Sequence, residues 1–334
     1  MLSVVVPIYN EEENIRDFHR VLTKTMEQLD EDFEVVFVND GSRDKSLPML
    51  LEIGDADHHI VVVELSRNFG HQAALTAGLN VAKGDAVVLM DGDFQDPPSV
   101  VPRLVASWRA GAKVVIANRA SRAETGIRGR LFPLFYKVMG WVSDFPIPLN
   151  AGIFGLLDRQ AVDAINRLQE SNRYLPGMRS WIGFPTEFVA YDRADRAAGE
   201  PKQNFLRLFK YAADAIFSFS YKPLRLGMAL GGIVIAFSIF MSIVAIGNVI
   251  FDLKFFGVIP GRGHIGTMLA ILFLGGVQLV CVGLLGEYIG RIYDEVRKRP
   301  LFLIHQIHRA ETSKLRPFEL PEENALEKVQ SSAA

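Results

Sequence analysis

Short apolar runs alternate with longer amphipathic stretches along the first 118 residues. Runs rich in Val and Ile predict five β-strands, at 2–8, 33–39, 60–65, 86–90 and 113–118. The stretches between them predict helices at 12–29, 45–53, 72–81 and 99–110. Near-continuous apolar strands separated by helices are typical of a mostly parallel sheet that is covered on both faces. We therefore expect a Rossmann-like α/β domain, and we assign it residues 1–204.

Two later stretches are apolar without interruption. Residues 226–251 and 265–286 contain no Asp, Glu, Lys, Arg or His. Each exceeds the roughly 20 apolar residues that a helix needs to cross a bilayer. They predict a two-helix transmembrane hairpin over 226–290, with a buried hairpin in a soluble core as the alternative. Lys and Arg gather before the first run and after the second, so the positive-inside rule places both termini and the front domain in the cytoplasm.

The segments that flank the hairpin are polar or amphipathic. Residues 205–225 carry an apolar face opposite Arg207 and Lys210. This pattern predicts a helix lying in the membrane interface, and a helix packed on the front domain is the alternative. Residues 291–334 are expected to form a cytoplasmic tail, disordered from about residue 312 because its sequence there is polar.

Overall composition excludes several classes of protein. The 334 residues include 36 Lys and Arg against 38 Asp and Glu, and a net charge of −2 gives no general attraction to nucleic acid. A single cysteine, Cys281, excludes an intramolecular disulfide framework and a Cys-rich zinc site. The first strand is followed by neither a P-loop nor a dinucleotide-binding glycine motif, which argues against kinases and dehydrogenases.

Polar residues follow the predicted strands, where open parallel sheets bind their ligands. Asp91 and Asp93 follow the fourth strand, and Gln95 comes two residues later. Two carboxylates at this spacing can converge on one Mg²⁺ or Mn²⁺ ion, with the amide oxygen as a further ligand. A cation there would bridge a diphosphate and neutralise it as a leaving group. After the first strand, Asn10 and Glu13 predict a capping box for the first helix.

These strand ends resemble a known enzyme family. Pro-Ile-Tyr-Asn-Glu-Glu from Pro7, Asn-Asp-Gly-Ser from Asn39 and Asp-Gly-Asp-Phe-Gln-Asp-Pro-Pro from Asp91 are similar to motifs of the inverting family 2 glycosyltransferases, which have the GT-A fold. Gly-Glu-Tyr-Ile-Gly-Arg from Gly286, followed by Arg299 and a proline, narrows the resemblance to polyprenyl-phosphate glycosyltransferases. These include dolichyl-phosphate mannose synthase and the GtrB-type bactoprenol glucosyltransferases. The resemblance covers roughly residues 2 to 305.

The resemblance implies a role for each matching residue. Nucleotide-sugar binding is implied for Pro7, Tyr9, Glu11, Asp40 and Asp91. The metal ligands implied are Asp91, Asp93 and Gln95. Catalytic roles are implied for Asp93, Arg122, Arg128 and Asp158. Contacts with the acceptor phosphate are implied for Arg130, Arg196 and Lys202.

One segment departs from the family pattern. Relatives often carry Asp-x-Gly-Asp-Phe-Arg before Leu-x-Asp-Arg, whereas this chain reads Asn-Ala-Gly-Ile-Phe-Gly over 150–155. Two carboxylates and an arginine are missing, and Asp158 is left as a candidate, with a helix cap as its alternative. The chemistry tolerates the loss, because a phosphate monoester with a second pKa of about 6 is largely a dianion at neutral pH and needs little general base.

We therefore expect transfer of a hexose, with glucose from UDP-glucose as the first choice, to undecaprenyl phosphate on the cytoplasmic face of the plasma membrane. The products would be polyprenyl-phosphate sugar and UDP. The implied partners are the nucleotide sugar, the lipid acceptor, the bilayer and, through the glycines of the hairpin, a second copy of the chain. UDP-N-acetylglucosamine and GDP-mannose remain alternative donors. A processive polysaccharide synthase, a transporter subunit with a nucleotide sensor and an inactive scaffold remain alternative functions.

Overall fold

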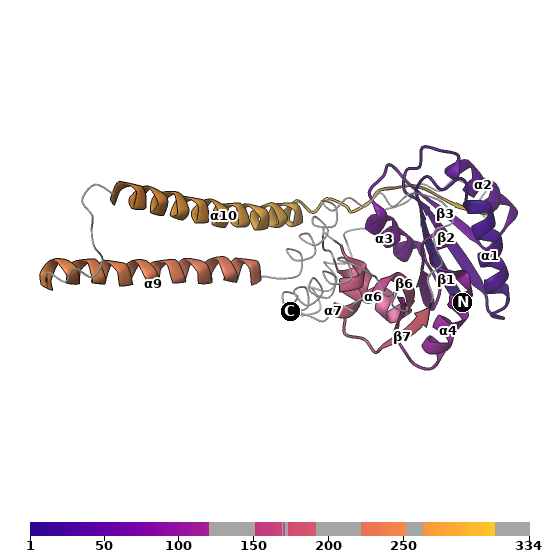
Figure 1. Cartoon of the computed structure of the whole chain (residues 1–334). Coiled ribbons are helices and arrows are strands. Elements are labelled where there is room, and N and C mark those ends of the chain that lie inside the picture. The colour runs from indigo at the N-terminus through magenta and orange to yellow at the C-terminus, as the bar shows by residue number, and fades with distance from the viewer. Residues whose placement is uncertain (120–150, 169, 171–172, 192–221, 252–262, 311–334) are drawn as a thin grey trace, which may run out of the picture. The chain divides into compact units, whose positions relative to one another are not determined.

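The computed structural model describes residues 1–119, 151–168, 170, 173–191, 222–251 and 263–310 (Figure 1). The chain divides into two units. The first includes the described residues within 1–125, 147–201 and 300–334, and the second includes those within 202–299. The first unit carries the sheet, and the second carries two long helices.

The first unit is built on one eight-stranded sheet with the order β7-β5-β6-β4-β1-β2-β3-β8. Its strands are β1 (Leu2–Ile8), β2 (Phe33–Asn39), β3 (Ile60–Leu65), β4 (Ala86–Leu89), β5 (Val114–Arg119), β6 (Ala151–Asp158), β7 (Thr186–Tyr191) and β8 (Ile304–Arg309). β1 pairs in parallel with β2 and β4, β2 with β3, and β5 with β7. The five strands that the apolar runs predict are all present, in a mostly parallel sheet.

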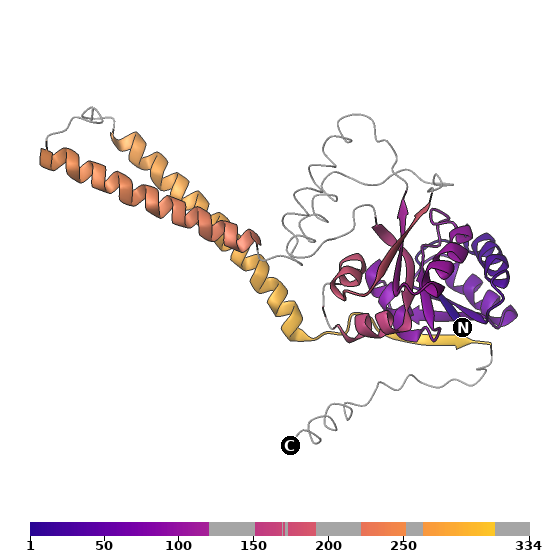
Figure 2. The same cartoon turned by 90° about the horizontal axis from the view of Figure 1, so that it is seen from below.

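Helices cover both faces of this sheet (Figures 1 and 2). One core contains side chains from α1 (Ile15–Glu27), α2 (Ser46–Ala56), the 3-10 turn η1 (Pro98–Val100) and α4 (Val101–Arg109). The other contains side chains from α3 (His71–Val81), α6 (Arg159–Arg167) and α7 (Leu175–Trp181). Val4 and Val6 of β1 belong to the first core and Val5 to the second, because successive strand residues point to opposite faces. The expected GT-A-like α/β fold is confirmed.

Two antiparallel strands were absent from the sequence prediction. β6 lies between β4 and β5 and runs antiparallel to both. β8 pairs antiparallel with β3, and the amide of Ser66 donates to the carbonyl of Leu303 just before it, at 2.9 Å. β8 is the yellow strand along the edge of the sheet in Figure 2. The segment expected to be only a tail therefore contributes an edge strand.

The first helix begins later than the capping box predicts. Asn14 is its N-cap residue, without a side-chain cap, and Ile15 is its first helical residue. Asn10 instead has a φ of 55° and accepts a hydrogen bond from the amide of Arg43 at 2.8 Å. The capping box does not form because the Asn10 side chain bonds to the loop after β2 instead of to the first turn of the helix.

The second unit contains α9 (Lys222–Phe251) and α10 (Gly263–Arg297), which lie side by side as a hairpin (Figures 1 and 2). A methyl group built on Gly227 would lie 3.8 to 3.9 Å from Leu284 and Cys281, so the two helices approach closely there. Among the described residues, Phe273–Arg297, which contains an 18-residue window with a mean hydropathy of 1.5, is the one stretch long and apolar enough to span a membrane. Gly227–Phe240 is a shorter apolar stretch. The two-span topology and its orientation stay predictions, and most of the expected interfacial segment, 205–221, lies outside the described residues.

Candidate active site

A pocket of about 380 Å³ lies at the carboxyl ends of the parallel strands. It is lined by Pro7, Ile8, Tyr9, Asp40, Asn68, Gly70, His71 and Ala74. Three residues assigned to nucleotide binding, Pro7, Tyr9 and Asp40, are therefore brought together in one cavity. Tyr9 is 44% exposed, so it is available to a ligand.

Asp40 lines this pocket and holds a neighbouring loop in place. Its carboxylate is buried and accepts hydrogen bonds from the amides of Phe69 at 2.7 Å and Gly70 at 2.9 Å. Burial raises the pKa of Asp40, while these two hydrogen bonds and the nearby His71 oppose the rise. The residue fixes the loop after β3 against the end of β2, a role that the sequence did not indicate.

The same close approach explains the glycine that follows. Gly41 has a φ of +64°, and a Cβ atom built there would lie 2.5 Å from the amide nitrogen of Asn68. A larger residue would be strained in the backbone and would push the loop away. Asp40 and Gly41 together therefore keep the loop after β3 close to the end of β2.

His71 links the pocket to the acidic pair. It is the first residue of α3, and its Nε2 lies 2.8 Å from the Oδ1 of Asp91. Burial lowers the pKa of His71, but the hydrogen bond to Asp91 and the charges of Asp91, Asp40 and Asp93 outweigh burial and raise it. The structure places His71 against a predicted metal ligand, and no local sequence motif signalled that contact.

The loop after β4 is folded tightly around its own acidic residues. Asp93 accepts a hydrogen bond from the amide of Gln95 at 3.0 Å, and the Gln95 side chain is only 5% exposed. Asp96 is buried and accepts from the hydroxyl of Tyr191 on β7 at 2.7 Å. This last contact joins the loop to the far strand of the sheet, and nothing in the local sequence predicted it.

The donor chemistry of this loop fits a hard divalent cation. Asp91 and Asp93 are partly exposed and offer carboxylate oxygens, which are the ligands that Mg²⁺ and Mn²⁺ prefer. They lie beside a pocket of a size that suits a nucleotide. Gln95 is buried beneath the same loop, so its part in a metal site stays a prediction.

Glu11 stands apart from the pocket lining. Its side chain accepts from the Asn14 carboxamide at 2.8 Å, and its amide donates to the hydroxyl of Ser46 at 2.9 Å. These contacts join the loop after β1 to the start of α2. They give Glu11 a role in fixing the loop, and its predicted contact with the nucleotide remains untested.

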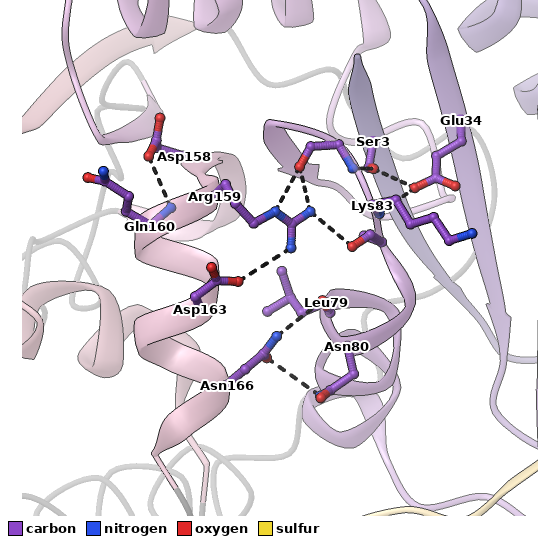
Figure 3. Close-up of polar contacts among 12 residues, drawn as sticks. Ser3, Glu34, Leu79, Asn80, Lys83, Asp158, Arg159, Gln160, Asp163 and Asn166 are labelled. Carbon is purple, nitrogen blue, oxygen red and sulfur yellow. Dashed lines mark hydrogen bonds and ion pairs between the residues drawn. The ribbon is translucent and has the colours of Figure 1, made fainter. Parts of the chain in front are cut away.

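Asp158 lies at the opposite end of the strands from Asp91 and Asp93. It pairs with Ala86 at the start of β4, whereas Asp91 follows the end of that strand. Asp158 caps α6 by accepting from the amide of Gln160 at 3.0 Å, as Figure 3 shows, and also accepts from the indole of Trp108 at 2.8 Å. These hydrogen bonds and Lys113 lower its pKa although burial alone would raise it. The structure thus supports the helix-cap alternative and does not bring Asp158 to the acidic pair.

Arg159 stabilises the structure at this same end of the strands. Its guanidinium donates to the carbonyls of Gly84 and Ala82, each at 2.9 Å, and pairs with Asp163 at 3.7 Å (Figure 3). The start of α6 is therefore tied to the loop that precedes β4. This network is structural and lies apart from the pocket.

A buried arginine from another helix contacts the segment that departs from the family pattern. Arg179 of α7 is 1% exposed and donates to the carbonyl of Ile153 at 3.0 Å and to that of Gly152. Its Nη1 lies 3.2 Å from where Gly155 would carry a Cβ atom, so the glycine leaves room for the guanidinium. Burial lowers the pKa of Arg179 to about 10, which keeps it protonated at neutral pH. It braces the beginning of β6.

The remaining predicted cations lie outside the described residues. They are Arg122, Arg128, Arg130, Arg196 and Lys202. Their assignments to phosphate binding and catalysis stay predictions.

Comparisons with known proteins cover almost the whole chain. The model of glycosyl transferase family 2 matches residues 3–165, and the model of the GtrB C-terminal hairpin matches residues 222–292. An uncharacterized glycosyltransferase of Synechocystis is 41% identical over 92% of this chain and 95% of its own length. A prophage-derived bactoprenol glucosyl transferase of Shigella flexneri is 41% identical over 92% of this chain and 98% of its own length. The chain therefore belongs to glycosyltransferase family 2, in the group that carries the GtrB C-terminal hairpin.

Proposed function

We propose that this enzyme transfers glucose from UDP-glucose to undecaprenyl phosphate, giving undecaprenyl-phosphate glucose and UDP. The observation that carries the proposal is the similarity to bactoprenol glucosyl transferases, which at about 40% identity spans both the catalytic domain and the hairpin. An acceptor that resides in the bilayer also explains why a sugar-transferring domain is joined to apolar helices.

The pocket would hold the nucleoside part of the donor. Tyr9 is exposed and offers a ring on which a base can stack, and Asp40 fixes the neighbouring loop through its hydrogen bonds with Phe69 and Gly70. The diphosphate would then reach Asp91 and Asp93 at the neighbouring strand end. A divalent cation held by these two carboxylates would supply neutralisation of the leaving diphosphate.

The acceptor phosphate is the nucleophile in this scheme. One of its oxygens forms a bond with C1 of glucose while the bond from C1 to the β-phosphate oxygen breaks, so UDP leaves and the configuration at C1 inverts. At neutral pH the phosphate monoester is largely a dianion, and no protein base has to remove a proton. This explains how the enzyme can act with Asp158 engaged as a helix cap.

Two anions must meet in this reaction, and cationic side chains would lower the repulsion between them. We assign this role to Arg122, Arg128 and Arg130, which follow β5 in the chain, and to Arg196 and Lys202 nearer the hairpin. We further propose that α9 and α10 anchor the catalytic domain at the cytoplasmic face of the plasma membrane. Anchoring would raise the effective concentration of enzyme near the lipid acceptor.

The test is transfer of radiolabel from UDP-glucose into organic-extractable lipid by the purified full chain, with undecaprenyl phosphate and Mg²⁺ or Mn²⁺. We expect alkali-stable, mild-acid-labile label. UDP-N-acetylglucosamine and GDP-mannose serve as competing donors in parallel reactions. Label from one of these donors alone would replace glucose in the proposal, and no label from any donor with intact UDP binding would overturn it.

A further inference from the structure

A group of imidazole side chains lies around one carboxylate at the amino-terminal ends of the parallel strands. Asp57 directly follows α2, His58 and His59 lead into β3, and His19 projects from α1. β3 and β4 run in the same direction. The residues before β3 therefore lie at the opposite end of the strands from Asp91, which follows β4. The group is therefore separate from the candidate active site.

The carboxylate of Asp57 holds two of these rings in place. Its Oδ1 lies 2.8 Å from the Nδ1 of His59, and its Oδ2 lies 3.0 Å from the Nε2 of His19. The His59 amide donates to Oδ1 as well, at 3.0 Å, so the turn itself is fixed. His59 also stacks on Phe33, with the ring centroids 4.2 Å apart. The local structure thus presents an oriented imidazole beside an oriented carboxylate.

His58 completes a set of three potential ligands. Its ring lies 3.9 Å from that of His59, centroid to centroid, and the residue is exposed. One donor atom each from Asp57, His58 and His59 lie within 4.8 Å of one another. Tetrahedral zinc with bonds of 2.0–2.1 Å needs its donors about 3.3 Å apart, so a modest rotation of the exposed ring closes the set.

We propose that Asp57, His58 and His59 form a binding site for a divalent transition metal of the zinc class, with His19 orienting the carboxylate. Imidazole nitrogen favours Zn²⁺, Ni²⁺ and Cu²⁺, whereas the all-oxygen pair Asp91 and Asp93 favours Mg²⁺ and Mn²⁺. A hydrogen-bonded partner behind a ligand is the usual means of fixing its orientation. The chain would therefore carry two cation sites of different chemical preference, one at each end of the parallel strands.

A metal in this position would brace the domain. It would join the end of α2 to the start of β3, and through His19 it would hold α1 against both. We expect the bound ion to raise thermal stability without being required for sugar transfer, because it lies away from the pocket. The site does not depend on the identity of the donor or acceptor.

The experiment titrates the chelator-treated full chain with Zn²⁺ by calorimetry, in excess Mg²⁺ so that the oxygen site is occupied. One equivalent should bind, and Co²⁺ should give the visible absorption of a site with nitrogen ligands. His58→Asn and His59→Ala should each weaken Zn²⁺ binding by about tenfold or more. His305→Asn is the matched control, since His305 is an exposed histidine on β8 in the same domain.

His58 is exposed, so its substitution tests the site without risk to the fold. Unchanged Zn²⁺ affinity in His58→Asn and His59→Ala would overturn the proposal. Complete displacement of Zn²⁺ by Mg²⁺ would also overturn it, because the ion would then be bound by carboxylates alone. Loss of affinity in His305→Asn would place the ion on β8 instead.

Discussion

Asp158 is a residue at which a structural and a catalytic role predict opposite outcomes. Replacing it with Ala removes the N-cap of α6 and the acceptor of the Trp108 indole, while the pocket at the other end of the strands keeps all its contacts. We therefore expect Asp158→Ala to lower stability and to leave kcat and the KM for the donor close to those of the wild type. If Asp158 were catalytic, Asp158→Ala would instead lower kcat and leave stability close to that of the wild type.

The size of the effect follows from the contacts that are lost. An N-cap hydrogen bond contributes about 1 kcal/mol, and a buried donor left without an acceptor costs about 1–3 kcal/mol. Lys113 is about a third exposed, so its pairing with Asp158 adds at most about 1 kcal/mol after solvent screening. Asp158→Ala should lose about 2–5 kcal/mol in total. Asp158→Ser keeps a capping oxygen but not the Trp108 contact, and it should lose about 1 kcal/mol less.

Urea unfolding of the detergent-solubilised chain, followed by tryptophan fluorescence, measures these losses, and the radiolabel assay measures transfer. The pH dependence gives a second readout. Because the pKa of Asp158 is lowered by folding, its contribution is present above about pH 4 and is lost as the pH falls through the lowered value. The difference between wild type and Asp158→Ala should therefore shrink in acid. Wild-type stability combined with a loss of transfer in Asp158→Ala would refute the helix-cap assignment.

Three further predictions concern the pocket and the sheet. Asp93→Asn should reduce transfer by about a hundredfold or more with little change in the urea midpoint, because Asp93 is partly exposed; full activity of this variant in the presence of chelator would exclude a metal at the acidic pair. Asp40→Ala should cost about 2–4 kcal/mol and weaken UDP binding measured by calorimetry, because two amides lose their acceptor; an unchanged UDP affinity would mean that this part of the pocket does not contact the nucleotide. A chain ended after Arg299 lacks β8 and should self-associate in light-scattering measurements, whereas a monodisperse product would show that β3 tolerates an open edge.

The sequence predicted the elements that have an unmistakable periodic signal. Five strands were evident because buried parallel strands read as unbroken Val and Ile runs, and the acidic pair was found because it directly follows one of them. β8 was missed because its sequence, Ile-His-Gln-Ile-His-Arg, is short and rich in polar residues, and because it follows a charged helix end. An edge strand needs only one apolar face, so it carries a weaker signal.

Contacts between distant segments could not be predicted from local pattern. Asp40 looks like a nucleotide ligand because it follows a strand, yet its partners, Phe69 and Gly70, come from the next strand-to-helix loop. The pairing of Asp96 with Tyr191 is likewise visible only in three dimensions. Asp158 was left with two alternatives, since an aspartate before a helix can cap it or serve chemistry. Its position beside Ala86 favours the cap.

The pairing of β3 with β8 sets an order for biosynthesis. β3 leaves the ribosome long before β8, and the whole helical hairpin is translated between them. During that interval the edge of β3 has no neighbour on one side, and the side chains of Phe302, Ile304 and Ile307 that pack on the second core are not yet made. The catalytic domain can complete its sheet only after the hairpin has been synthesised. Completion of the catalytic domain therefore follows the synthesis of α9 and α10.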